Sequence, residues 1–196
     1  YEKGKAEALN QKGFCHVQVA DFESALGELH AALKIFNALE DLNGIGSANY
    51  NIGLVFIRMG DFQMALDHEL KSLEVREQLN DCIGQGNCHL QIGYIYEHFN
   101  DFEGSLGHYQ KCHDLHLSVS NMVCVSAGLI GMASLYIMKN DHEKVKYYLE
   151  EGIKIRKTIN DPRGHGATMH RYTNYFFQNE NYEEAKKTAE ELIAVD

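Results

Sequence analysis

The chain repeats a turn signal every forty residues, and this period constrains its fold more than any other feature. One phase of the repeat holds Asp21, Asp61, Asp101, Asp141 and Asn181, and the opposite phase holds Asp41, Asp81, Asn121 and Asp161. Turn residues therefore recur every twenty residues, with helically spaced apolar residues between them. Fixed periods of this length are typical of solenoids, in which each unit buries its apolar face against its neighbours.

We predict an all-α solenoid of about five helix-turn-helix repeats, with a helix filling each interval between turns. The repeats span approximately 1–40, 41–80, 81–120, 121–160 and 161–196. The first helices are predicted over 3–18, 43–58, 83–98, 123–138 and 163–178. The second helices are predicted over 21–39, 61–79, 101–119, 141–159 and 181–195. Asp and Asn residues stand at these helix starts. Their side chains can act as N-caps, because they accept hydrogen bonds from backbone N–H groups of the first turn.

Three glycines recur at the same phase of the first helices, at Gly13, Gly53 and Gly93. Glycine inside a helix costs about 1 kcal/mol relative to alanine, so its return at one position needs a reason. We expect a neighbouring helix backbone to approach too closely there for a side chain. A second glycine set begins at Gly44, Gly84 and Gly164; its recurrence indicates tight packing between repeats, and a dinucleotide-binding loop would need a preceding strand.

Composition excludes several classes of partner. The formal net charge is −10 and the hydrophobic content 44%, so we expect a packed core and no binding to nucleic acid phosphates or to anionic membranes. No run of eighteen apolar residues is present, so no membrane span is predicted. The pattern starts within a helix at Tyr1 and ends in an apolar stretch, Leu192 to Val195. We therefore expect a single array, 1–196, that is a fragment of a longer protein.

The cysteines and histidines of the chain do not form a recognisable disulfide, metal-binding or catalytic pattern. The five cysteines are odd in number and do not recur in register, which argues against a disulfide framework and favours a reducing, cytoplasmic location. His108, Cys112 and His116 share one helix face and could hold zinc. Cys112 also falls in a small-residue column, so we interpret it as core and leave metal binding to a zinc titration. No catalytic motif is found, and we predict neither an enzyme nor a cofactor.

The small and aromatic columns resemble the tetratricopeptide repeat family along the whole chain. They are Gly53, Phe56, Ala65 and Ser72 in the second repeat, Gly93, Tyr96, Ser105 and Cys112 in the third, and Ala133 and Tyr136 in the fourth. The fifth repeat departs, with Thr173 at the glycine position. The family's usual period is about 34 residues; the longer period here is similar to Pins-type adaptors, bacterial peptide-sensing regulators and bacterial sensor domains.

The resemblance implies a right-handed α-α superhelical solenoid with a concave groove lined by the first helices. The residues that it places in the groove are Asn10, Phe14, Tyr50, Leu54, Ile57, Arg58, Leu90, Tyr94, Glu97, His98, Ile130, His170, Asn174 and Phe177. Family members that bind chaperone tails hold a carboxylate with Lys, Asn and Arg at such places. Phe14, Leu54 and Tyr94 stand there instead, which favours an apolar or amphipathic protein segment as the partner.

The function expected from this resemblance is a non-catalytic protein-protein interaction scaffold that binds a protein or peptide segment in its groove. We expect it to be the regulatory or sensor part of a larger signalling protein, with any output enzyme domain outside these residues. One alternative is a receptor for a small peptide or metabolite that switches an output domain. Another is a homo-oligomerisation module, for example a homodimer formed through the chain ends. Function inferred from a fold family is an analogy and needs its own test.

Overall fold

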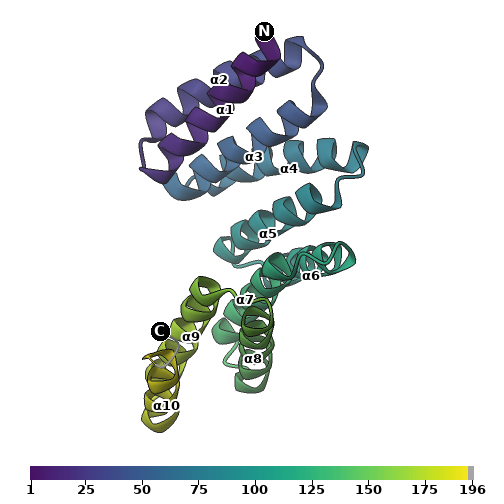
Figure 1. The fold of residues 1–196 in the computed structure, drawn as a ribbon. Coiled ribbons are helices and arrows are strands. Elements are labelled where there is room, and N and C mark those ends of the chain that lie inside the picture. The colour runs from purple at the N-terminus through teal and green to yellow at the C-terminus, as the bar shows by residue number, and fades with distance from the viewer. Residues whose placement is uncertain (194–196) are drawn as a thin grey trace. The chain divides into compact units, whose positions relative to one another are not determined.

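The computed structural model describes residues 1–193, which form ten α-helices arranged as five consecutive helix pairs (Figure 1). The first helices of the pairs are α1 (Glu2–Gln18), α3 (Leu42–Met59), α5 (Cys82–His98), α7 (Met122–Met138) and α9 (Pro162–Gln178). The second helices are α2 (Phe22–Ala38), α4 (Phe62–Gln78), α6 (Phe102–Ser118), α8 (His142–Thr158) and α10 (Tyr182–Ile193). The predicted all-α solenoid fold class is confirmed.

The predicted boundaries of these helices agree with the observed ones to within one residue, except at the last C-terminus. There the sequence predicted a helix to residue 195, whereas α10 is described to Ile193. Ala194 and Val195, part of the predicted apolar end, lie outside the described residues. The agreement has a simple cause, because every helix start except the first carries a capping side chain.

The predicted N-caps are confirmed by hydrogen bonds from the first turn of each helix. In each case the side-chain Oδ1 of the cap accepts the backbone N–H three residues later. The donors are Ser24, Gly44, Met64, Gly84, Gly104, Cys124, Lys144, Gly164 and Glu184, at 2.9–3.5 Å. These bonds satisfy N–H groups that a helix otherwise leaves without a partner.

Every turn has a residue in the left-handed backbone region immediately before the cap. These residues are Ala20, Glu40, Gly60, Asn80, Asn100, Ser120, Asn140, Asn160 and Glu180, with φ between 51° and 80°. The turn after α2 shows the pattern: the N–H of Asp41 donates to the carbonyl of Phe36 at 3.0 Å, and that of Glu40 to Asn37 at 3.2 Å. This is a Schellman C-cap. Its last residue is also the N-cap of the next helix, which is why the turns are so short.

The chain divides into two compact units, Tyr1–Ser105 and the residues from Leu106 onward. In unit 1 the core is distributed between adjacent helices: Val17, Leu29, Ile52 and Val55 form one buried cluster, and Ala6, Ala32, Phe36 and Ala48 another. In unit 2 the buried side chains include Val125, Leu129, Leu135, Leu149 and Met169. Each unit therefore buries apolar surface from helix to helix, as expected for repeats that stabilise their neighbours.

The first helices lie on the inner side of unit 1. The Cα atoms of α1 and α3, and those of α3 and α5, approach within 8 Å. No such approach occurs between α2 and α4 in the described part of unit 1. In unit 2, α7 and α9 approach one another in the same way, whereas no approach of α8 to α10 is found among its described residues.

Gly13 and Gly53 are confirmed as crowded positions, but the predicted backbone neighbour is wrong at Gly53. A Cβ atom added at Gly53 would lie 2.6 Å from Oε1 of Glu69, and the three nearest atoms all belong to that side chain. At Gly13 the nearest atom is Cγ of Leu29 at 2.6 Å, and the carbonyl oxygen of Ala25 follows at 3.2 Å. These positions therefore require glycine mainly because a long side chain of the paired helix lies against the backbone there.

The second glycine set marks the joints between repeats, as predicted. A side chain at Gly44 would collide with the Phe36 ring, one at Gly84 with Arg76, and one at Gly164 with Arg156. At the joint between the third and fourth repeats this column holds Cys124. The partner column there holds His116, whose ring is shorter than an arginine side chain. The side chain near the end of one second helix thus limits the size of the residue that faces it in the first turn of the next helix.

Arg76 and Arg156 form the same polar clamp two repeats apart. Arg76 donates to Asp81 at 2.7 Å and to the hydroxyl of Ser47 at 2.9 Å. Arg156 donates to Asp161 and, at 2.8 Å, to the hydroxyl of Ser126. The Gly164 N–H and the Arg156 guanidinium hold the pKa of the Asp161 carboxyl below its ordinary value. Each clamp therefore connects both helices of its own repeat to the N-cap of the next.

No helix within residues 1–193 is long and apolar enough to cross a membrane.

Candidate partner-binding site

Side chains on the first helices form polar contacts from one repeat to the next. In unit 1, Asn51 donates to Oδ1 of Asn10 at 3.1 Å, and Gln91 donates to the hydroxyl of Tyr50 at 3.3 Å. Arg58 donates to the backbone carbonyl of Val17 at 3.2 Å. These pairs are all 41 residues apart, so neighbouring first helices are held in constant register. We call the accessible surface of α1, α3 and α5 the inner face of unit 1.

Most of the predicted groove residues in unit 1 have accessible surface on this inner face. Phe14, Arg58, Tyr94 and His98 are exposed, and Tyr50, Leu54, Ile57, Leu90 and Glu97 are half-buried. Asn10 is buried beneath its hydrogen bond to Asn51. Tyr50 and Leu54 also pack against core clusters, so part of each ring or side chain belongs to the interior.

An aromatic cluster forms the most apolar part of this face. The rings of Phe62 and His98 stack at 4.1 Å, and Tyr94 meets the His98 ring edge-on at 4.6 Å. Tyr94 retains 39% of its surface exposed. Phe62 starts the second helix α4, so a search restricted to first-helix columns missed it. Its recurrence with Phe22 and Phe102 at one phase was the signal that could have indicated it.

In unit 2, α7 and α9 enclose a cavity of about 350 Å³ on the corresponding face. Its lining comprises Ile137, Ala167, His170, Arg171, Asn174, Tyr175 and Gln178. His170 and Asn174 were predicted groove residues, and their side chains meet at 3.3 Å. Ile130 is half-buried nearby on α7, while Phe177 is 63% exposed but does not line the cavity.

Arg171 lines the cavity but is not among the predicted groove residues. Its guanidinium donates to the hydroxyl of Ser134 on α7 at 2.6 Å. Guanidinium, imidazole and amide groups together offer several donors and few acceptors. The cavity can therefore hydrogen-bond carbonyl or carboxylate oxygens of a bound segment.

Comparison with known proteins identifies the repeat. A family model described as tetratricopeptide repeat matches residues 4–78. The match covers the two N-terminal repeats, which are similar to this family. The family resemblance predicted from the sequence is thereby confirmed. No curated protein matches the chain.

Solved structures show the same fold over the full set of repeats. A signal transduction ATPase with numerous domains from Pyrococcus horikoshii, which has a tetratricopeptide repeat sensor, matches with a TM-score of 0.82 and 21% identity. Aspartyl phosphate phosphatase F from Bacillus subtilis matches with a TM-score of 0.86 and 12% identity, over 97% of this chain. A Rap protein complexed with Competence and Sporulation Factor matches with a TM-score of 0.77 and 15% identity.

This chain is shorter than these structures. It spans 30% of the Pyrococcus protein, 50% of the Bacillus phosphatase and 64% of the Rap protein. At these identities the matches establish the tetratricopeptide-like fold alone.

Cys112 and His116 of the third repeat are part of the packed interior of this helical array. Cys112 and His116 are both fully buried, and burial raises the pKa of the Cys112 thiol to about 12. Burial also lowers the pKa of His116, whose ring nitrogens have no hydrogen-bond partner. A protonated thiol is a poor metal ligand. Among residues 1–193, no group of three or more His, Cys, Asp or Glu is placed to hold a metal ion.

Proposed function

We propose that the chain is a non-catalytic scaffold whose first-helix surfaces bind a protein or peptide segment, within a larger signalling protein. The observation that carries the proposal is the cavity between α7 and α9, where His170, Arg171 and Asn174 present hydrogen-bond donors. The donors would bind backbone or carboxylate oxygens of the segment. Independently of that cavity, the aromatic cluster around Tyr94 in unit 1 offers apolar contacts to a bound segment.

The related structures support this role by analogy. One is named as a protein with a tetratricopeptide repeat sensor, and another as a Rap protein in complex with Competence and Sporulation Factor. The net charge of −10 favours a protein partner over a nucleic acid, because phosphates would be repelled. The groove residues named above are proposed as the contact residues.

Selection from a random peptide library displayed on phage, followed by fluorescence polarisation of the enriched peptides, tests this proposal. We expect Tyr94→Ala or His170→Ala to weaken the binding of at least one enriched peptide about tenfold, the size of a typical hot-spot effect. Tyr147→Ala is the matched control, because Tyr147 is 60% exposed but belongs to the second helix α8. Its affinity should stay within about twofold of the parent chain.

Two results would contradict the proposal. One is peptide binding that Tyr147→Ala abolishes but that Tyr94→Ala and His170→Ala both leave intact. The other is the absence of any enriched peptide together with concentration-dependent dimers in sedimentation, which would favour the homo-oligomerisation alternative. The volume of the cavity between α7 and α9 also supports the alternative function, a receptor for a small peptide or metabolite. Its volume of about 350 Å³ is within the range of small-molecule sites, about 300–1,000 Å³.

A further inference from the structure

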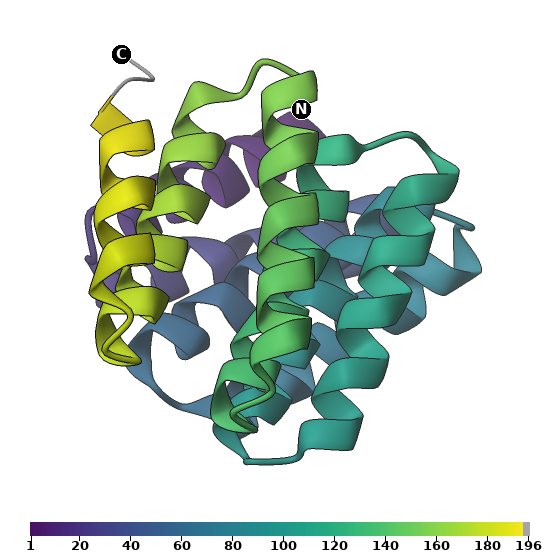
Figure 2. The ribbon, with the colours of Figure 1, turned by 90° about the horizontal axis from the view of Figure 1, so that it is seen from below.

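A second pair of cavities opens on the opposite side of unit 2, between the second helices α8 and α10. Figure 2 shows α8, α9 and α10 side by side. One cavity has a volume of about 430 Å³, and its floor is made by Ile153, Met169, Tyr172 and Thr188. The other, of about 470 Å³, adjoins it and includes Tyr175 and Phe176. Lys146 and Glu184 line both, so the two form one groove.

One residue of the groove's floor, Thr188, lies where three other repeats have a ring, at His68, His108 and Tyr148. Thr188 occupies the column that holds His68 in the second repeat. His68 is buried there, with Nδ1 at 2.9 Å from Oδ1 of Asn49 and its ring 6.5 Å from that of His30. Thr188 is shorter, and its hydroxyl turns back to the helix carbonyl of Glu184 at 2.9 Å. The space that an imidazole fills in the second repeat therefore stays open in the fifth.

Two further columns change in the same repeat pair. Lys146 stands where the first three repeats have leucine, namely Leu26, Leu66 and Leu106. His142 stands where they have phenylalanine, and it forms a hydrogen bond with the hydroxyl of Tyr175. Leu26 and Leu66 pack against buried clusters in unit 1. Replacing such a leucine by lysine places a cation at the edge of an apolar floor.

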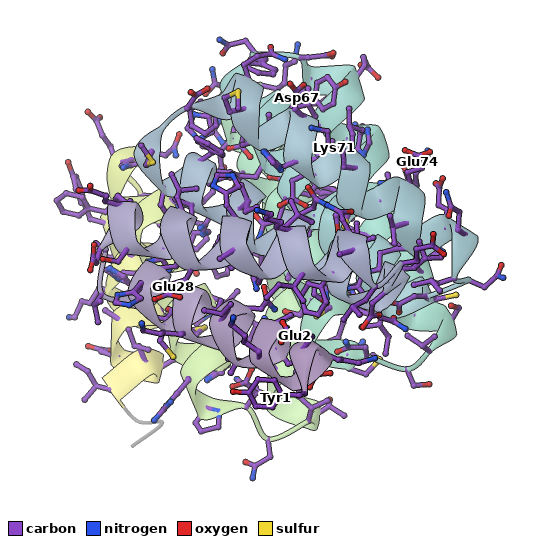
Figure 3. The ribbon with its side chains drawn as sticks, turned by 90° about the horizontal axis from the view of Figure 1, so that it is seen from above. Tyr1, Glu2, Glu28, Asp67, Lys71 and Glu74 are labelled. Carbon is purple, nitrogen blue, oxygen red and sulfur yellow. The ribbon has the colours of Figure 1, made fainter. Side chains whose placement is uncertain are left out.

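The groove also reverses the charge found at the same positions in the second repeat. Lys187 occupies the column of Asp67, and Lys154 that of Glu74, both of which Figure 3 labels on α4, although the Lys154 column also holds Lys34 in the first repeat. The first cavity is lined by four lysines, Lys146, Lys154, Lys157 and Lys187, and by three glutamates, Glu150, Glu184 and Glu191. In a chain of net charge −10, this is a local excess of positive charge.

Two of those glutamates already have partners, which leaves a cation available. Glu150 accepts from the Tyr172 hydroxyl at 3.2 Å and lies 3.9 Å from Lys146. Glu184 lies 3.9 Å from Lys187. Lys154 lies 3.5 Å from Glu151, and neither Lys157 nor Glu191 has an ion partner within 4.0 Å among the described residues. The lining holds one lysine more than it holds glutamates, so a single negative charge on a ligand would be balanced, whereas the nearby glutamates would repel a dianion.

We propose that the groove between α8 and α10 binds a small organic monoanion, in which one carboxylate is attached to an apolar body. The body would lie on Ile153, Met169 and Tyr172, each at most 9% exposed. The carboxylate would lie among Lys146, Lys157 and Lys187. This site is separate from the inner faces, and it does not depend on the proposed function.

Isothermal titration of the full chain with decanoate tests the proposal, with decanol and acetate as partial ligands. Decanoate is expected to bind at concentrations up to about 1 mM, and each partial ligand about fivefold or more weaker. Thr188→His fills the cavity as His68 does in the second repeat, and it should weaken decanoate about tenfold. Lys146→Leu restores the leucine column and should weaken decanoate about fivefold while affecting decanol little.

Lys186→Leu is the matched control, because Lys186 lies on α10 but outside the groove. Its decanoate affinity should stay within about twofold of the parent chain. The proposal is overturned if decanoate gives no heat and no rise in Tm at about 1 mM, or if decanol binds as tightly. It is also overturned if decyl phosphate, a dianion, binds better. If circular dichroism shows that Thr188→His does not fold, two comparisons still decide the outcome. One is decanoate binding by Lys146→Leu and the parent chain, and the other is decanoate against decanol on the parent chain.

Discussion

The carboxylate of Glu69 lies over Gly53 in the interior of unit 1. An added Cβ atom at Gly53 would be 2.6 Å from Oε1 of Glu69. In the first repeat the same two positions are Gly13 and Leu29, with the same separation between an added Cβ atom and Cγ of Leu29. A carboxyl group has therefore taken the place of a core leucine. Glu69 is fully buried, and neither of its oxygens has a partner in hydrogen-bond geometry in the described chain, although the Cys88 thiol beside it partly opposes the rise of its pKa.

Glu69→Leu should stabilise the protein at neutral pH. Leaving buried polar atoms without partners costs about 1–3 kcal/mol, and leucine already fits the equivalent site in the first repeat. We expect the free energy of unfolding in urea to rise by about this amount. Glu69→Gln serves as the control, because it keeps the shape and the polar atoms and should recover little of the gain. Destabilisation by Glu69→Leu would show that the carboxyl group makes a favourable interaction there.

The same substitution should change how stability depends on pH. Burial raises the pKa of Glu69 well above its ordinary value of 4.5, so the folded state holds a proton that the unfolded state releases. The stabilisation from this proton is complete below pH 4.5 and is lost as pH rises towards the folded-state pKa. Parent and Glu69→Leu chains should therefore differ more in Tm at pH 8 than at pH 4. A difference independent of pH would contradict this assignment.

Acid should act through buried histidines in the opposite direction. Burial lowers the pKa of both His68 and His116 from 6.5, so the unfolded state binds more protons below that value. Their contribution to stability is present above pH 6.5 and is lost as pH falls through the folded-state pKa. His116→Leu should reduce the loss of Tm between pH 7 and pH 5. An unchanged slope would mean that this ring is accessible to protons in the folded state.

Two glycine substitutions should have opposite effects although both lie in helices. Gly44→Ala would collide with the Phe36 ring, and we expect it to cost about 1–3 kcal/mol, as overpacking of a core does. Gly27→Ala has open space around it and should stabilise the chain by about 0.5–1 kcal/mol through helix propensity. Urea unfolding of both variants checks this pair. Equal effects would show that the joint at Gly44 repacks freely.

The left-handed turn residues offer a further gain in stability. Glu40 has φ of 51°, a conformation that costs a non-glycine residue about 1–2 kcal/mol, while the equivalent residue one turn later is Gly60. Glu40→Gly should raise the free energy of unfolding by about 0.5–1 kcal/mol, after the greater entropy of an unfolded glycine is subtracted. Asn80→Gly should gain less, because asparagine tolerates this region better. Thermal unfolding measured by circular dichroism is the test.

The sequence alone determined the helices, the turns and the period. Asp and Asn caps and left-handed residues act through hydrogen bonds a few residues away, so their positions can be read directly from the chain. The repeat phase also selected His170 and Asn174, which line the cavity between α7 and α9. Only the tertiary structure decided what crosses each crowded position, such as Glu69 over Gly53, because that depends on contacts between helices. The groove between α8 and α10 arises in the same way, since an open space depends on what neighbouring helices fail to fill.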